Sequence, residues 1–249
     1  MKEKSCILIE FTGKVSESGK IFDTTDEKTA KEAGLYKEQA VFKPVPVIIG
    51  NGDVLKGLDI ALREMSEGES KNIKLSPEKA FGQRQKELIV VIPVKQFTER
   101  KIKPFPGLIV DLNGQYGRVQ TVSGGRVRVD LNNDLAGKDV EYSVKIIKEI
   151  KTTKEKAEVL TEKYFPMKDK KVETKLEENI LKVKFPKELA SQIGALLVPF
   201  TKTIKEAIPE IKSVEFVESF EGKTVKEKES KSGTHTHTHA DGTVHHHEH

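Results

Sequence analysis

Alternating apolar and polar positions dominate the first half of the chain. Residues 5–12 alternate strictly, with Ile7, Ile9 and Phe11 on one face, which predicts a half-buried strand. The turn SESGK separates this segment from a second strand that begins in KIFDTT. A polar, helix-prone stretch follows, and VPVIIG then predicts a third strand that ends at the turn GNGD. Apolar and polar residues alternate again in KNIKLS, which predicts a fourth strand.

One helix is expected among these strands. In LKGLDIALREM the residues Leu58, Leu62 and Met65 recur at positions i, i+4 and i+7, which places them on one face of a short amphipathic helix. The first part of the chain therefore predicts an antiparallel sheet covered by a single helix.

The chain then leaves this sheet before completing it. After SPEKAFGQR come ELIVVIPVKQF, KIKPFPGLIVDL and QYGRVQTVSGGRVRVDL, which are short strand-like runs separated by Gly and Pro turns. This spacing is typical of a small all-β unit. Only LAGKDVEYSVKIIKEI supplies a strand long enough to complete the first sheet. We therefore expect one domain over residues 1–86 and 130–151, with a β domain over residues 87–129 inserted into it.

Residues 152–225 predict a separate α+β domain in the order αββαβ. A helix stops before Pro166, a hairpin turns near Asn179, and one or two helices, with a possible kink at Pro199, precede a last alternating strand. The apolar run Leu196, Leu197, Val198 and Phe200 fits either a core or a dimer seam. Residues 226–249 are charged and His-rich, and we expect them to form a disordered tail.

Composition excludes several classes of function. The 43 basic and 39 acidic residues give a net charge of +4 and alternate along the chain, whereas nucleic-acid binding needs basic residues concentrated on one face. No run approaches the ~18–20 apolar residues of a membrane span, and the first residues lack a signal-peptide pattern. The single cysteine, Cys6, is expected to be a buried apolar residue. We expect a cytoplasmic protein without nucleic-acid or membrane partners.

The position of the histidines limits the chemistry. All seven lie between His235 and His249, so no residue before Gly233 can use imidazole as a base or a ligand. No phosphate-binding GxxxxGK[ST] motif is present either. Aromatic residues and one acid, Asp23, are left as candidates, and such residues by themselves more often form a core than a site.

The order EFTGKV, GKIFDTT, GNGDVLKGLDIALREMSEGESKNIKLSPEKAFG and VEYSVKI closely resembles the FKBP-type peptidyl-prolyl cis-trans isomerases. The resemblance covers residues 5–83 and 130–150. The inserted unit resembles the insert-in-flap domain of SlyD-type members, and the trailing domain is similar to that of long-chain archaeal members. The resemblance implies an α+β fold: an antiparallel FKBP-type sheet wrapped on a short helix, with an inserted β domain and a C-terminal αββαβ domain.

The resemblance also implies a pocket that holds a prolyl ring. Its residues would be Phe11, Phe22, Asp23, Val54, Leu55, Leu58, Phe81 and Tyr142. Many eukaryotic members have Tyr at the positions of Phe11 and Phe81 and Trp at that of Leu58, so tight macrolide binding is not implied.

The implied activity is rotation about Xaa–Pro bonds, and it requires no cofactor. Rotation has a barrier of ~18–20 kcal/mol because it breaks amide resonance. An apolar pocket disfavours the polar planar amide relative to the twisted transition state. The aromatic residues would grip the proline ring and the Leu55 N–H would hold a substrate carbonyl, while Asp23 would orient a hydroxyl or polarise the amide.

The expected partners are unfolded or proline-containing polypeptides. An exposed sheet edge in the inserted unit can bind an extended client strand, and the candidate residues are Ile89, Val91, Ile92 and Phe97. The unit could instead be only a spacer. Homodimerisation through the C-terminal domain is implied by the archaeal resemblance. A holdase without isomerase activity remains an alternative function.

The tail suggests a second alternative, a metal-handling protein. Imidazole binds Ni, Zn and Cu ions, and SlyD-type members carry nickel-binding tails. The candidate ligands are His235, His237, His239, His245, His246, His247 and His249. A native tail is favoured over a cloning remnant because THTHTHADGTVHHHEH is not a uniform purification run.

Overall fold

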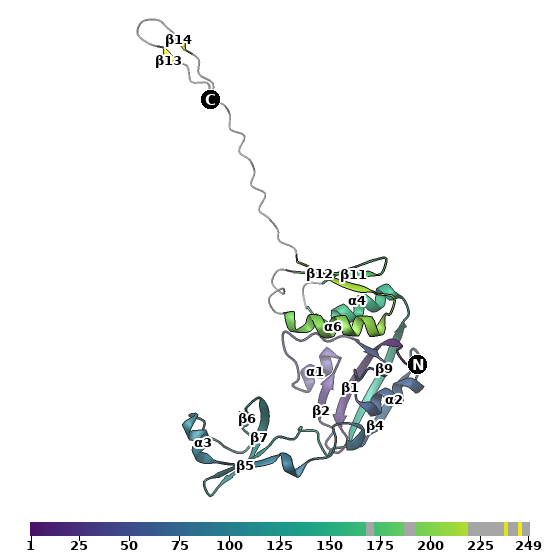
Figure 1. Ribbon diagram of the computed structural model, residues 1–249. Coiled ribbons are helices and arrows are strands. Elements are labelled where there is room, and N and C mark those ends of the chain that lie inside the picture. The colour runs from purple at the N-terminus through teal and green to yellow at the C-terminus, as the bar shows by residue number, and fades with distance from the viewer. Residues whose placement is uncertain (168–171, 187–192, 219–236, 239–243, 246–249) are drawn as a thin grey trace. The chain divides into compact units, whose positions relative to one another are not determined.

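The computed structural model describes residues 1–167, 172–186, 193–218, 237–238 and 244–245 (Figure 1). Residues Met1–Glu218 form one compact unit and Ser219–His249 a second. In the second unit, β13 (His237–Thr238) and β14 (Val244–His245) pair antiparallel. No helix in the described part of the chain is long and apolar enough to cross a membrane.

A five-stranded antiparallel sheet forms the first part of the large unit. Its strands have the order β2-β1-β9-β4, and β3 also pairs with β1. They are β1 (Cys6–Val15), β2 (Ile21–Thr24), β3 (Val45–Ile48), β4 (Ser70–Leu75) and β9 (Val140–Ile150). The expected last strand thus lies at the centre of the sheet, and the α+β class with antiparallel sheets is confirmed.

Two helices accompany this sheet. α2 (Lys56–Glu64) packs one apolar face on the inner side of the sheet, where Leu58 and Leu62 join Ile7, Ile9 and Ile146 in a common core. The short α1 (Glu27–Glu32) lies in the stretch after β2, and the Asp26 carboxylate caps its first turn by accepting the Thr29 N–H.

The segment between β4 and β9 builds a four-stranded antiparallel sheet of its own, in the order β5-β8-β7-β6. Two 3₁₀ turns, η1 (Pro77–Lys79) and η2 (Lys86–Leu88), precede it. Its strands are β5 (Ile89–Pro93), β6 (Ile109–Leu112), β7 (Gln115–Ser123) and β8 (Arg126–Asp130).

The prediction of a purely β insert needs one correction. Val94–Glu99 form a short helix, α3, that begins directly after Pro93. Its buried Phe97 packs on Val110, Val119, Val127 and Val129 in the core of the insert. A helix of fewer than two turns, with only Val94 and Phe97 packed on this core, is too short to show helical periodicity.

The chain leaves and re-enters the first sheet through a polar junction. The buried Asp130 carboxylate accepts hydrogen bonds from Gln120 Nε2 (2.9 Å) and the Asn132 N–H (2.9 Å), and it forms an ion pair with Arg84. The Asn132 side chain in turn bonds both the N–H and the carbonyl of Gln85. These bonds hold together the two connecting segments between the insert and the first sheet.

The C-terminal part contains α4 (Thr153–Tyr164), β10 (Glu173–Glu177), β11 (Ile180–Phe185), α6 (Gly194–Ala207) and β12 (Ser213–Glu218). β10 and β11 form the expected hairpin, and β12 pairs with β11 in parallel. Pro199 lies inside α6. The apolar run in α6 is divided between two environments, because Phe200 is buried while Leu196 and Val198 are exposed.

The C-terminal part shares a core with the first sheet. Cys6, Ile48 and Ile150 pack with α4 and α6 residues such as Leu160 and Ile204. The start of β1 is therefore buried on both faces, not on one as its alternation suggested. Cys6 is buried as expected, and burial raises the pKa of its thiol to about 11.

Candidate active site

Four aromatic rings from separate segments meet on the inner side of the first sheet. Phe22 lies edge-on to both Phe81 and Tyr142, with ring centroids 5.7 Å apart in each pair. Phe11 and Tyr142 are tilted neighbours at 5.9 Å. β1, β2, β9 and the turn after η1 thus bring together all four aromatic residues predicted from the sequence.

A β-bulge places two consecutive residues of β2 at this site. Gly13 pairs with Asp23, but Lys14 pairs with Ile21, so Phe22 has no partner residue on β1. In a regular strand Phe22 and Asp23 would point to opposite faces, whereas a bulge can redirect a side chain. Phe22 consequently packs on Tyr142 while Asp23 lies close enough to Tyr142 to influence its ionisation.

Gly13 makes room for the ring cluster, and the sequence analysis missed it. A Cβ atom at this position would come within 2.8 Å of the Phe22 ring and 2.9 Å of the Tyr142 ring. The signal available in the sequence was a glycine inside the strand-like EFTGKV, since glycine in a strand often marks a bulge or a close approach.

The helix side of the site is apolar. Leu58 on α2 is buried, and Val54 and Leu55 pack beside it while remaining partly exposed. Leu55 is the N-cap residue of α2. Among the described residues no backbone acceptor is found for the Leu55 N–H, so this donor is available to a ligand.

Two carboxylates hold the loop that leads to Leu55. Asp59 accepts the Gly50 N–H at 2.8 Å and pairs with Arg63 at 3.0 Å. Asp53 accepts the Ile48 N–H at 2.8 Å. Gly50 and Gly52 have φ values of 84° and 75°, which residues other than glycine rarely adopt. The turn predicted at GNGD is therefore fixed at both ends.

The ionisable groups of the site are partly withdrawn from water. Burial raises the pKa of Asp23 above its usual value, although a backbone hydrogen bond at Thr24 opposes the shift. Burial, with a smaller contribution from the Asp23 charge, raises the pKa of Tyr142 to about 12. Tyr142 therefore stays neutral at physiological pH, and the site presents an apolar surface with one acid at its edge.

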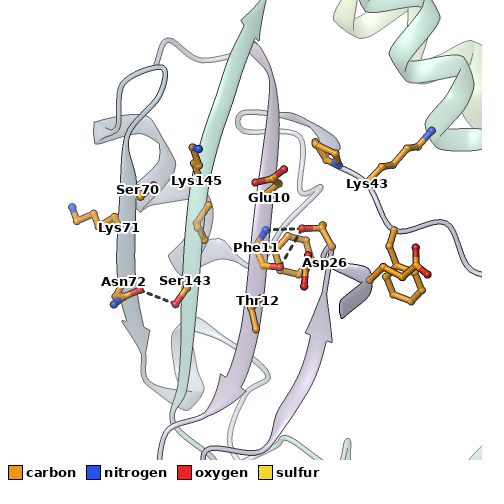
Figure 2. A pocket seen from close by; sticks show the side chains of 15 residues that line it. Glu10, Phe11, Thr12, Asp26, Lys43, Ser70, Lys71, Asn72, Ser143 and Lys145 are labelled. Carbon is orange, nitrogen blue, oxygen red and sulfur yellow. Dashed lines mark hydrogen bonds between the residues drawn. The ribbon is translucent and has the colours of Figure 1, made fainter. Parts of the chain in front are cut away.

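A hollow of about 540 Å³ lies on the other face of the same sheet. Figure 2 shows Glu10, Thr12, Ser143 and Lys145 along β1 and β9, with the Ser143 hydroxyl hydrogen-bonded to Asn72 at 2.7 Å. Glu10 and Thr12 alternate with Ile9, Phe11 and Gly13, so they face away from the aromatic cluster. The hollow is lined mainly by polar side chains. Phe11 and Phe42 also border it, but Phe22, Phe81 and Tyr142 do not.

The other predicted site residues are placed as follows. Val91 is 60% exposed, Ile89 is partly exposed, Ile92 packs on the core of the insert, and Phe97 is buried in it. Phe97 is thus unavailable as a surface contact. His235, His239, His246, His247 and His249 lie outside the described residues, and only the backbones of His237 and His245 are described. Within the described residues, no three His, Cys, Asp or Glu side chains are grouped to hold a metal ion.

Comparisons with known proteins agree with this geometry. Residues 1–98 match the model of the FKBP-type peptidyl-prolyl cis-trans isomerases, residues 90–135 that of the FKBP26 IF domain, and residues 153–221 that of the FKBP26 C-terminal domain. The short-type peptidyl-prolyl cis-trans isomerase of Methanocaldococcus jannaschii is 33% identical over 128 residues, which cover 51% of this chain and 82% of the relative.

Two bacterial relatives extend the comparison. A probable FKBP-type 16 kDa isomerase of Pseudomonas fluorescens is 32% identical over 45% of this chain and 73% of the relative. SlyD of Helicobacter pylori is 28% identical over 58% of this chain and 72% of the relative. The chain belongs to the FKBP-type peptidyl-prolyl cis-trans isomerase family. It is a peptidyl-prolyl cis-trans isomerase with an insert-in-flap domain, an enzyme class that needs no cofactor for catalysis.

Proposed function

We propose that this isomerase acts on unfolded polypeptides, which its inserted sheet binds beside the catalytic pocket. The proposal has two parts, the assignment of the pocket and the assignment of the client surface.

For the pocket, the proposed ligand is the proline ring of an Xaa–Pro bond. The rings of Phe11, Phe22, Phe81 and Tyr142 would surround it, and Leu58, with Val54 and Leu55 beside it, would form the floor. The Leu55 N–H, which has no backbone acceptor among the described residues, would hold a substrate carbonyl. The planar amide is polar and loses charge separation on twisting, so an apolar pocket favours the twisted state. Each tenfold acceleration requires only ~1.4 kcal/mol of such preference.

The experiment for the pocket is exchange spectroscopy on an Ala-Xaa-Pro-Phe peptide with the full-length chain. Phe81→Ala should lower kcat/KM without unfolding the domain, because the Phe81 side chain is partly exposed at the edge of the cluster. A Phe81→Ala variant as active as the unmodified chain would refute this assignment. No acceleration by the unmodified chain would instead support the alternative of a holdase with an inactive pocket.

The client surface is supported by exposed apolar residues on the outward face of the inserted sheet. Val90, Ile92 and Val110 point into the core of the insert. The alternate residues therefore point outward, and Val91 is 60%, Ile109 57% and Tyr116 71% exposed. Tyr116 pairs with Asp111 and Ile109 with Arg118, so Ile109 and Tyr116 are diagonal neighbours on this face, within reach of each other.

The edges of the inserted sheet add a second binding mode. Among the described strands, β5 pairs only with β8 and β6 only with β7, so each has one open edge. An extended client can pair with such an edge through its backbone, while its side chains contact the apolar face. Binding there would raise the local concentration of prolines at the pocket.

A paired assay separates client binding from catalysis. Replacing residues 89–130 by a short linker is geometrically feasible because the Leu131 N–H donates to the Leu88 carbonyl at 2.9 Å. The shortened protein should retain isomerisation of the tetrapeptide but lose most of its acceleration of proline-limited refolding of a whole protein. An equal loss in both assays would refute the division of labour, and no loss in either would make the insert a spacer.

A point variant sharpens this test. Ile109→Ser should weaken binding of an unfolded client, whereas Ile60→Ser, at a residue of α2 that is 50% exposed, should not. Equal weakening by both variants would show non-specific hydrophobic binding in place of a defined surface.

The exposed Leu196 and Val198 on α6 support a homodimer through the C-terminal part. The occurrence of every histidine after Gly233 supports a metal-binding tail that is separate from the pocket. Sedimentation of the full-length chain and of a Val198→Asp variant tests the first proposal, and a loss of dimer in the variant is the expected result.

A further inference from the structure

One ion pair links the C-terminal part to the loop of the pocket. Lys163 Nζ, near the end of α4, lies 2.9 Å from Asp53 Oδ2. The side chains are only 29% and 13% exposed, so this pair is better shielded from water than a typical surface ion pair. Asp53 Oδ2 is also the atom that accepts the Ile48 N–H at 2.8 Å.

Asp53 directly precedes the residues that form the helix side of the pocket. The next two residues are Val54 and Leu55, and the Leu55 N–H has no protein acceptor among the described residues. The conformation of Asp53 therefore sets where this N–H points. Asp53 is held by β3 on one side and by Lys163 on the other.

Lys163 is itself held firmly. Two neighbouring residues of α4, Leu160 and Thr161, are buried, and Leu160 belongs to the core that includes Cys6 and Ile48 of the first sheet. Glu162 pairs with Lys43 in the stretch before β3. The end of α4 is thus fixed on the first sheet by packing as well as by charge.

We propose that Lys163 is a positioning residue for the isomerase reaction. Through Asp53 it fixes the loop that orients the Leu55 N–H toward the substrate carbonyl. The C-terminal part therefore contributes to substrate binding although it does not line the pocket. The inference rests on the proposed role of the Leu55 N–H.

The test uses the full-length chain with the substitution Lys163→Met, which keeps the aliphatic stem and removes the charge. An orienting role predicts that KM for the tetrapeptide rises roughly threefold while kcat changes little, in line with the modest strength of a partly exposed ion pair. Lys163→Arg should restore KM because it keeps the charge. Hydrogen exchange at the Ile48 amide should accelerate in Lys163→Met, whose Asp53 is less constrained.

Two further variants control for general loss of packing. Lys43→Met breaks the neighbouring pair with Glu162 but does not touch the loop, and its KM should match that of the unmodified chain. In the double variant Asp53→Asn/Lys163→Met, KM should be no higher than with Asp53→Asn alone. The rate at which Cys6 reacts with a thiol reagent reports whether the C-terminal part stays docked, since Cys6 lies in the shared core.

The outcomes separate this inference from the proposed function. An unmodified chain that isomerises the peptide, together with an unchanged KM in Lys163→Met, overturns the inference and leaves the pocket assignment intact. Equal effects of Lys43→Met and Lys163→Met, or faster Cys6 labelling in Lys163→Met, also overturn it, because docking would then explain the change. An inactive unmodified chain overturns the pocket assignment itself.

Discussion

Gly13→Ala tests the geometry of the aromatic cluster most directly. The new methyl group would lie 2.8 Å from two carbons of the Phe22 ring and 2.9 Å from the Tyr142 ring. To reach an ordinary contact of 3.4 Å, the Phe22 ring must retreat by about 0.6 Å. Overfilling a packed site of this kind costs about 1–3 kcal/mol.

The backbone of Gly13 has an ordinary negative φ, so Ala adds no backbone strain there. The entire effect should therefore come from the two rings. Because both rings belong to the proposed proline pocket, we expect kcat/KM for the tetrapeptide to fall about tenfold, which corresponds to ~1.4 kcal/mol. Thermal unfolding should show a lower Tm.

The matched control is Gly194→Ala, where the new methyl group meets nothing within 4 Å. This variant should keep the activity of the unmodified chain, and its Tm should be equal or slightly higher because alanine favours the helix of which Gly194 is the first residue. The assay is exchange spectroscopy at several peptide concentrations, with ring proton shifts of Phe22 and Tyr142 as a structural readout. A Gly13→Ala protein with shifted rings and unchanged kcat/KM would refute the assignment of these rings to catalysis.

Three further predictions concern titration and the tail. Burial raises the pKa of Asp23 in the folded protein, so the charged carboxylate lowers the stability of the fold above that pKa. Asp23→Asn should therefore raise the Tm at pH 7 and lose this advantage below about pH 4. A lower Tm of the variant at pH 7 would contradict the shift. The Cys6 thiol, with a pKa of about 11, should react with a thiol reagent at pH 8 only through opening of the shared core, so that labelling accelerates in denaturant. Truncation after Gly233 removes all seven histidines and should abolish nickel binding in calorimetry while sparing peptide isomerisation; a collapse of catalysis would show that tail and pocket are coupled.

Much of the fold follows from local patterns in the sequence. Period-two alternation locates β1 and β4, and the spacing of Leu58 and Leu62 locates α2. β4 and α2 each bury one face, and β1 alternates although its first residues are buried on both faces. The return of the chain in β9 could be predicted since no earlier segment was long enough to complete the sheet.

The remaining features depend on pairing between distant segments. The bulge at Phe22 arises from the register of β2 against β1. The sequence of one strand does not determine how it is aligned with its neighbour, so the bulge could not be predicted. Cys6 was expected to be buried, but the core that covers it and the partly buried Leu8 comes from the C-terminal part, more than 140 residues away. Asp53 looked like an ordinary turn residue, because its partner Lys163 lies on a helix that sequence spacing does not relate to it.

The central place of β9 also determines the order in which a growing chain can fold on the ribosome. β9 lies between β1 and β4 and is made after every strand of the insert. During synthesis the inserted sheet therefore has all its strands while the surrounding sheet still lacks its middle. Domains generally fold as units as they emerge, so the inserted sheet is ready to fold before the catalytic pocket can close. A nascent molecule would thus pass through a stage in which the proposed client surface is formed but the sheet of the isomerase domain is still incomplete.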